Sequence, residues 1–200
     1  MPLLPQEPWL FPDNLLTRAP ETAGGNARWW VLHTRPRAEK SLARQLLHND
    51  TAFFLPLAKR RWPSRGRWLC SYKPLFPSYV FFHGDEDARR DALATNLIAS
   101  CLPVVDQERL HADLTRVHRL MLTDAPLTPE DRLEPGAAVE ITGGPFQGLT
   151  GTVLRRGHRL RLVVEVQFLR RGVSVELESW MLQPLQKQPQ HTGPQCVGCP

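Results

Sequence analysis

Residues 135–153 read Pro-Gly-Ala-Ala-Val-Glu-Ile-Thr-Gly-Gly-Pro-Phe-Gln-Gly-Leu-Thr-Gly-Thr-Val. The four glycines between positions 143 and 151 supply the positive φ angles or the close backbone approach that sharp turns between short strands require. Pro145 fixes φ at one corner. Phe146 is left at the tip of the turn, where it either caps the end of a small β-structure or faces a partner. The stretch predicts short, tightly turned strands.

The residues after this turn alternate with the period of a half-buried strand. Every second residue from Leu160 to Phe168 is apolar, while Arg159, Arg161 and Glu165 fall on the other face. Shorter alternating runs occur around Val139 and around Val175. Four or five short strands within about fifty residues predict a small SH3-like β-barrel over residues 135–185.

Length and composition suit two small domains. The chain has 200 residues, a formal charge of +5 and a pI near 9.4. This basic balance suits a partner that carries phosphate or an acidic surface. The first residues lack the basic flank and unbroken apolar run of a secretory signal, and no stretch reaches the roughly 18 apolar residues of a membrane span. We expect a cytoplasmic protein without membrane contact.

No motif for catalysis, a cofactor or a metal is present. The histidines lack metal-ligand spacing, and there is no nucleophile elbow, Walker A loop or carboxylate pair. Cys196 and Cys199 form only half of a zinc site, within a Pro- and Gln-rich segment over residues 186–200 that we expect to be a disordered tail. We therefore expect no enzyme and no cofactor.

Proline and glycine divide the rest of the chain. Residues 1–27 are Pro-rich and predict a flexible extension, although the cluster Trp9-Leu10-Phe11 could instead dock on the body or on a partner. Residues 28–122 predict an α+β fold in the order β-α-β-β-α-β with a trailing helix, the helices covering one side of an antiparallel sheet. Residues 123–134 predict a linker. The expected elements are strands 29–34, 53–57, 76–82 and 101–105, helices 36–48 and 85–95, and a trailing helix after Asp106.

A basic block lies between the second and third of these strands. Residues 51–84 contain no acidic residue, and the block forms a predicted hairpin with its turn near Ser64-Arg65-Gly66. Such a block either follows a phosphate backbone, with an indole for base stacking, or is a solvated hairpin tip; the coincidence of cations and aromatics favours nucleic acid. The candidate nucleic-acid-binding residues are Lys59, Arg60, Arg61, Arg65, Arg67 and Trp68.

Two segments resemble parts of the NusG family of transcription factors. The run Gly-Gly-Pro-Phe-Gln-Gly-Leu-Thr-Gly-Thr-Val and the strand Val173–Leu177 resemble the family's C-terminal KOW module. Trp-Trp-Val-Leu-His-Thr at 29–34 and Pro-Leu-Phe-Pro-Ser-Tyr-Val-Phe at 74–81 resemble its N-terminal (NGN) domain. The resemblance implies a ferredoxin-like NGN domain followed by the SH3-like barrel. Ser78 stands where the family often has Gly, and relatives of the RfaH type also carry a polar residue there.

The resemblance also implies partners. The NGN domain would bind the clamp of RNA polymerase next to the DNA of the elongation complex, and the KOW module would bind a ribosomal protein or the termination factor Rho through positions matching Phe146 and Leu169. Leu169 replaces a common aromatic. For Trp30 and Phe54, a place in the sheet core is an equal alternative. The implied polymerase-binding residues are Trp30, His33, Phe54, Phe76 and Tyr79.

The expected function is that of a transcription elongation factor. It would bind the polymerase clamp, suppress pausing and modulate termination or antitermination, with the barrel recruiting a second partner. The alternative is a ribosome-associated RNA-binding KOW protein that uses the barrel and the basic hairpin on structured RNA. Co-purification with polymerase or with ribosomal subunits would separate the two.

Overall fold

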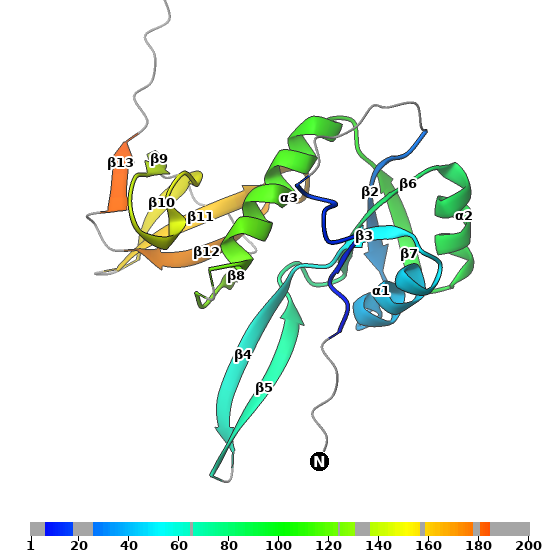
Figure 1. Cartoon of the computed structure of the whole chain (residues 1–200), viewed down its shortest axis with the longest axis horizontal. Helices are drawn as coiled ribbons and strands as arrows, with labels where there is room; N and C mark the ends of the chain where they lie inside the picture. The colour runs from blue at the N-terminus through cyan, green and yellow to red at the C-terminus, as the bar shows by residue number, and fades with distance from the viewer. Residues whose placement is uncertain are drawn as a thin grey trace, which may run out of the picture.

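The structure is a computed structural model that describes residues 7–17, 26–64, 66–123, 125–130, 137–156, 159–177 and 181–184. The predicted tail over 186–200, with Cys196 and Cys199, and the candidate Arg65 lie outside these residues. Two larger sheets and a hairpin carry the fold (Figure 1). The strands and helices up to α3 are β1 (Leu10–Phe11), β2 (Arg28–Thr34), α1 (Glu39–His48), β3 (Ala52–Phe54), β4 (Leu57–Ser64), β5 (Arg67–Pro74), β6 (Tyr79–Gly84), α2 (Glu86–Ala94), β7 (Ile98–Pro103) and α3 (Gln107–Met121).

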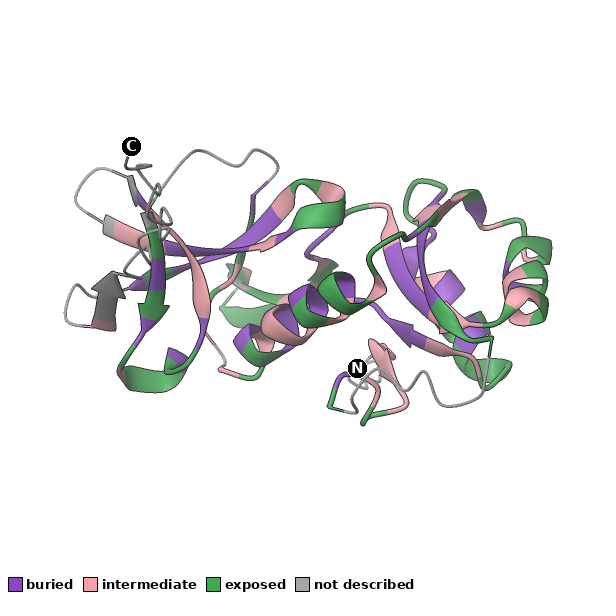
Figure 2. Cartoon of the chain, turned by 90° about the horizontal axis from the view of Figure 1, so that it is seen from above, coloured by how far each residue is buried: buried purple, intermediate pink, exposed green. Residues whose placement is uncertain are grey.

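The first five-stranded sheet, here the N-terminal sheet, has the order β1-β3-β6-β2-β7 with antiparallel pairing throughout. The predicted α+β class and the order β-α-β-β-α-β are confirmed. Helices α1 and α2 pack on one face of the sheet, as expected. The trailing helix α3 packs on the other face, because its apolar stripe meets the side chains that alternate away from α1 and α2 (Figure 2).

Several element ends differ from the expected ones. The helix expected from residue 36 begins at Glu39, because Arg37 has a left-handed φ of 63° that no helix can contain. The strand expected over 53–57 is divided, since β3 ends at Phe54 and β4 leaves the sheet to pair only with β5. The two predicted N-caps are confirmed: Asp85 and Asp106 accept hydrogen bonds from the third backbone N–H of α2 and α3 at 2.8 and 2.9 Å.

The second sheet, here the C-terminal sheet, contains six strands in the order β13-β9-β10-β11-β12-β8. Gly144 and Gly148 have φ of 78° and 77°, as the tight turn requires, and a Cβ on Gly151 would lie 2.6 Å from the carbonyl oxygen of Val163. Its elements are β8 (Thr128–Glu130), β9 (Ala137–Ile141), η1 (Gly144–Phe146), β10 (Thr150–Arg156), β11 (Arg159–Val166), η2 (Gln167–Leu169), β12 (Arg171–Leu177) and β13 (Leu182–Pro184).

A closed barrel is not confirmed. Among the described residues no pairing joins the two edge strands, β13 and β8. Strand β8 comes from the segment expected to be a linker, and it takes the free edge of β12. Its Glu130 carboxylate, only 7% exposed, accepts a hydrogen bond of 2.6 Å from the Ser174 hydroxyl. Part of the expected linker is therefore a strand of the C-terminal sheet.

Part of the N-terminal extension packs on the body. Residues 7–17, here called the arm, add β1 to the edge of β3, and Leu16 is 2% exposed. The remaining positions of the expected flexible extension lie outside the described residues, apart from residues 26 and 27. For residues 7–17, the structure has the docked form of the two forms that the sequence allowed.

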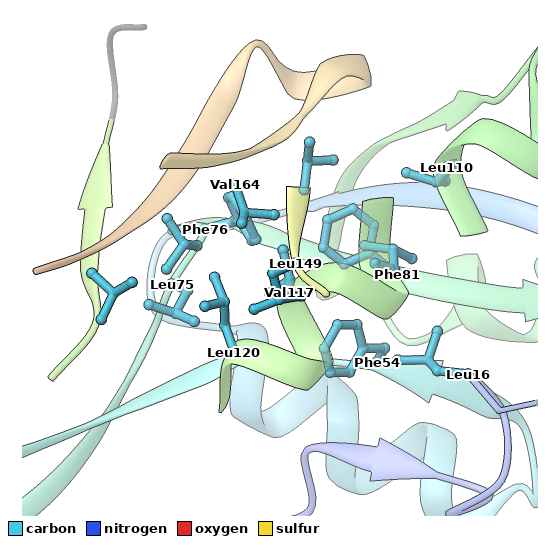
Figure 3. Close-up of a cluster of buried hydrophobic side chains, with 14 of the residues drawn as sticks. Leu16, Phe54, Leu75, Phe76, Phe81, Leu110, Val117, Leu120, Leu149 and Val164 are labelled. Atoms are coloured by element: carbon cyan, nitrogen blue, oxygen red, sulfur yellow. The ribbon is translucent and has the colours of Figure 1, made fainter. Parts of the chain in front are cut away.

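Two apolar clusters hold the molecule together. The outer cluster lies between the N-terminal sheet and α1 and α2, and includes Trp30, Leu32, Leu42, Phe53 and Phe82. The central cluster lies between the N-terminal sheet, α3 and the C-terminal sheet (Figure 3). It includes Leu16, Phe54, Leu75, Phe76, Phe81, Leu110, Leu114, Val117, Leu120, Phe146, Leu149, Leu162 and Val164.

Candidate functional site

The strand period separates the five residues that were expected to bind polymerase together. Alternation along β2 sends His33 to the α3 face of the sheet and Trp30 to the opposite face, into the outer cluster. There the indole N–H of Trp30 donates to the Gly84 carbonyl oxygen at 3.3 Å. Trp30 therefore does not join the others. The residues on the α3 face are His33, Phe54, Phe76 and Tyr79, here called the aromatic patch.

Ring contacts connect the aromatic patch to the core beneath it. The rings of His33 and Tyr79 lie 5.1 Å apart, and Phe76 meets Phe81 edge-on at 5.8 Å. Phe54 and Phe76 are 0% and 1% exposed, whereas His33 and Tyr79 are half-buried. The patch is thus a graded surface, with two rings at its floor and two at its rim.

The C-terminal sheet covers this patch. Phe76 shares the central cluster with Leu149 and Val164 (Figure 3), and the Arg171 guanidinium of β12 lies 5.4 Å from the centre of the Tyr79 ring. In this arrangement the floor of the patch, Phe54 and Phe76, is buried and therefore not accessible to another protein. A partner that binds it must displace the C-terminal sheet.

Polar contacts fix α3 to the C-terminal sheet, and sequence reasoning missed them. The Asp113 carboxylate, on a residue 1% exposed, accepts a hydrogen bond of 2.9 Å from the Gln167 backbone N–H and pairs with Arg116. The Arg119 guanidinium donates to the Gln147 carbonyl oxygen at 3.3 Å. Beside them is a cavity of about 270 Å³ lined by α3 and strands β9 to β11. In the sequence, these contacts were indicated only by the acidic Asp113 within the apolar stripe of α3.

The loop before β6 contains Ser78, the polar residue that stands where the NusG family often has glycine. Ser78 has φ of 66°, in the left-handed region that glycine adopts without strain. Its backbone N–H donates to the buried Glu39 carboxylate of α1 at 2.8 Å. Glu39 therefore anchors the loop that carries Phe76 and Tyr79, a role that the sequence did not reveal.

The basic hairpin β4–β5 projects from the body (Figure 1). Lys59, Arg60 and Arg67 are exposed, and the indole of Trp68 is 75% exposed. Leu69 beside it is 43% exposed. The hairpin thus offers cations and an aromatic face together, as its sequence predicted; Arg61 belongs to β4 by its backbone.

The two candidate partner residues of the C-terminal part lie against the central cluster. Phe146 is 5% exposed in η1, and Leu169 is partly buried in η2 beside α3. In this arrangement Phe146 presents no exposed anchor, which matches the capping alternative.

The described residues contain neither a group of side chains suited to a metal ion nor a helix suited to crossing a membrane. No group of three or more His, Cys, Asp or Glu side chains among them could hold a metal ion. No helix in this part of the chain is both long enough and apolar enough to cross a membrane.

Comparison with known proteins gives consistent relatives. Residues 27–118 match the family model described as "Transcription termination factor nusG". The "Transcription termination/antitermination protein NusG" of Rickettsia typhi (strain ATCC VR-144 / Wilmington) is 26% identical over 180 residues, covering 82% of this chain and 92% of that protein. The protein of the same name from Rickettsia prowazekii (strain Madrid E) has the same identity and coverage.

One solved structure is similar over much of its length. It is titled "Crystal Structure of MjSpt4:Spt5 complex conformation B", and the match covers 80% of this chain and 97% of that one at 16% identity. The TM-score of 0.26 is too low to establish a shared overall arrangement.

Proposed function

We propose that the chain is a NusG-type factor and that it acts in transcription elongation and termination as a non-enzymatic factor that binds RNA polymerase. In this proposal residues 28–122 are the polymerase-binding NGN domain and 135–185 the KOW module. Residues 123–134 connect the two, and β8 within this segment belongs to the C-terminal sheet. The factor holds the polymerase clamp closed and so suppresses pausing. The KOW module then recruits a second partner, a ribosomal protein or Rho.

The aromatic patch carries this proposal. Its half-buried rim, His33 and Tyr79, stands over fully buried rings, and the surface is apolar enough to pack with the C-terminal sheet of the same chain. Aromatic rings supply a large contact area at low entropic cost, so a patch of this kind can receive helices of another protein. We therefore place the clamp contact at His33, Phe76 and Tyr79, with Phe54 supporting them from below and Trp30 excluded.

Polymerase binding then competes with the C-terminal sheet for the same surface. In the closed form of the factor the C-terminal sheet covers the patch, and in the open form the patch is uncovered. A ligand can shift the equilibrium between these two forms only by the difference in its affinity for them. The free energy needed to separate the C-terminal sheet from the aromatic patch must therefore be smaller than the free energy gained from the polymerase contact. Opening would also uncover Phe146 and Leu169, which makes the second partner accessible only after the first has bound.

Clamp closure follows the same principle. A factor that binds the closed clamp more tightly than the open one raises the population of the closed clamp, and no chemical step on the factor is needed. The exposed cations of the hairpin support a second contact, to the DNA of the elongation complex, because released counterions add affinity. The exposed indole of Trp68 supports stacking on an unpaired base in this proposal.

Binding and pausing assays with purified components test the proposal. The full chain should bind polymerase rather than isolated ribosomal subunits, and it should shorten the dwell time at a defined pause. The variant Asp113→Ala, which weakens the closed form, should bind polymerase at least as tightly. If neither chain binds polymerase, the proposal fails; if both bind only ribosomal subunits, the RNA-binding alternative replaces it.

The hairpin contact has a separate test in the salt dependence of DNA binding. Each phosphate that a cation neutralises contributes about −0.9 to the slope of log affinity against log salt concentration on duplex DNA. Replacing Lys59, Arg60 and Arg67 by Ala should make this slope shallower by up to about 2.7 if all three contact phosphate. The exposed Arg90 of α2, replaced by Ala, is the matched control. An unchanged slope in the triple variant would remove the hairpin from the DNA contact.

A further inference from the structure

The edge of β3 needs a neighbouring strand to cover it. Without β1, β3 would be the outermost strand of the N-terminal sheet. It reads Ala-Phe-Phe and carries neither a charge nor a proline. An apolar edge without such protection exposes backbone N–H and C=O groups that readily pair with another extended chain. Edges of this kind are also where folded domains recognise extended peptides.

The arm supplies the missing strand. Leu10 and Phe11 pair antiparallel with Phe54 and Phe53. The backbone N–H of Leu55 donates to the Trp9 carbonyl oxygen at 2.6 Å, which extends the pairing past β3. These contacts use only the main chain, so they would hold any extended segment in this register.

Side chains of the arm reach both faces of the sheet. On the α1 side, the Glu7 carboxylate lies 2.8 Å from the Arg44 guanidinium through both of its oxygens. At the edge, the Trp9 ring lies 6.2 Å from Phe54 and 5.6 Å from His118 of α3. These contacts add specificity to the main-chain pairing, because they favour a segment with an acidic residue followed two positions later by an aromatic residue.

A final contact closes the arm on α3. Leu16 is 2% exposed in the central cluster, and its carbonyl oxygen accepts a hydrogen bond of 3.2 Å from the Thr115 hydroxyl. The turn between β1 and Leu16 is held by hydrogen bonds within the arm itself, such as Leu15 N–H to the Pro12 carbonyl oxygen at 2.9 Å. The arm therefore brings part of its own shape to the site (Figure 1, dark blue).

We propose that the edge of β3, with Arg44 of α1 and Thr115 and His118 of α3, is a peptide-binding site that the chain's own arm occupies in cis. Its ligand is an extended segment with an acidic residue, an aromatic residue two positions later, and two apolar residues that pair with β3. The arm is a detachable ligand of this site rather than an integral strand of the sheet. The site is separate from the aromatic patch except at Phe54, and the proposal does not depend on polymerase binding.

Binding in trans tests the proposal directly. A chain lacking residues 1–17 is mixed with a fluorescein-labelled synthetic peptide of residues 6–18, and fluorescence anisotropy is measured. We expect saturable 1:1 binding, and at least tenfold weaker binding of the same peptide with Trp9→Ala. The bound peptide should restore slow amide exchange at Leu55. A folded shortened chain that does not bind the peptide at about 1 mM would overturn the proposal.

Variants of the full chain give a second test that does not require the shortened chain to fold. Trp9→Ala should speed amide exchange at Leu55 at least tenfold while interior amides of α1 stay protected. Asp13→Ala, an exposed position of the same arm, is the matched control and should leave Leu55 unchanged. An unchanged Leu55 in Trp9→Ala would overturn the proposal. A stable dimer of the full chain that dissociates in Trp9→Ala would also overturn the cis arrangement, because the arm would then sit on a second copy.

Discussion

At the scale of single residues, alternation along β2 decides which aromatics can act together. Trp30 follows Trp29 directly, yet the two indoles lie in different clusters. Trp30 is held by a hydrogen bond to Gly84 and by the guanidinium groups of Arg28 and Arg89, at 4.2 and 5.1 Å from its ring. Such an environment stabilises the fold and keeps the indole away from the aromatic patch.

This separation predicts that two aromatic substitutions affect different properties, stability in one case and polymerase binding in the other. Trp30→Phe removes the indole donor and should lower the free energy of unfolding by about 1–3 kcal/mol without changing polymerase affinity. Tyr79→Ala, at the rim of the patch, should weaken polymerase binding at least tenfold. Chemical denaturation and a polymerase binding titration measure the two effects. Loss of polymerase binding in Trp30→Phe alone would contradict the assignment of faces.

The buried His118 and the half-buried His83 make the free energy of unfolding depend on pH. Burial lowers the pKa of His118, and burial followed by the charge of His111 lowers the pKa of His83. The unfolded chain, with histidine pKa values near 6.5, therefore binds more protons than the folded chain below that pH. The free energy of unfolding should be full above about pH 6.5 and should fall as the pH drops towards the lowered folded values.

The variant His118→Leu isolates one of these two groups. It should flatten the decrease in the free energy of unfolding between about pH 7 and pH 5, because a leucine cannot take up the proton. Urea unfolding at each pH measures it, and the value at pH 7.5 separates any packing effect. A slope as steep as in the parent chain would exclude His118 from the pH response.

At the scale of elements, α3 is shared by two sheets. Leu114, Val117 and Leu120 are fully buried in the central cluster, to which both the N-terminal and the C-terminal sheets contribute. Asp113 and Arg119 hold backbone groups of the C-terminal sheet from the same helix. One amphipathic helix thus connects the aromatic patch to the sheet that covers it.

The Asp113 contact should control how firmly the C-terminal sheet is held. Asp113→Ala leaves the Gln167 N–H and the Arg116 guanidinium without their carboxylate partner, which should cost about 1–3 kcal/mol of closed-state stability. Amide exchange at Gln167 should accelerate while exchange in β2 stays slow. The exposed Asp91→Ala is the control. Equal exchange at Gln167 in both variants would contradict the role of Asp113.

At the scale of the whole molecule, the central cluster makes the two sheets one cooperative unit. It contains buried residues from the arm, the N-terminal sheet, α3 and the C-terminal sheet. Each fully buried apolar side chain contributes about 1.5–3 kcal/mol, so neither sheet can lose this contact without a large cost. The closed arrangement is therefore favoured until a partner takes over the same surface.

Cooperative unfolding follows from the shared cluster. Amides of β2 and β11 in the parent chain should lose their protection at the same urea concentration, because the cluster links them. In Asp113→Ala the amides of β11 should open at lower urea than those of β2. Residue-resolved exchange across a urea series measures both. Separate transitions in the parent chain would mean that the sheets are independent.

The amino-acid sequence alone determined the local structure. The period of two in β11 and the apolar stripe of α3 predicted a strand and a helix, and Asp85 and Asp106 predicted the helix starts. Of the four turn glycines, Gly144 and Gly148 adopt the expected positive φ angles. These features depend on neighbours within a few residues, which a single sequence displays. The resemblance to the NusG family also came from the sequence, because turn and loop motifs carry it.

Tertiary structure alone decided what each surface touches. The sequence marked Trp30 and Tyr79 alike as aromatic, and only the pairing of β2 with β6 and β7 placed them on opposite faces. It marked Trp9-Leu10-Phe11 as an apolar cluster in a Pro-rich segment, and only the fold shows that this cluster pairs with the edge of β3. It could not show that the C-terminal sheet covers Phe76. Contacts between distant residues depend on the packing of the whole chain, and no local pattern encodes them.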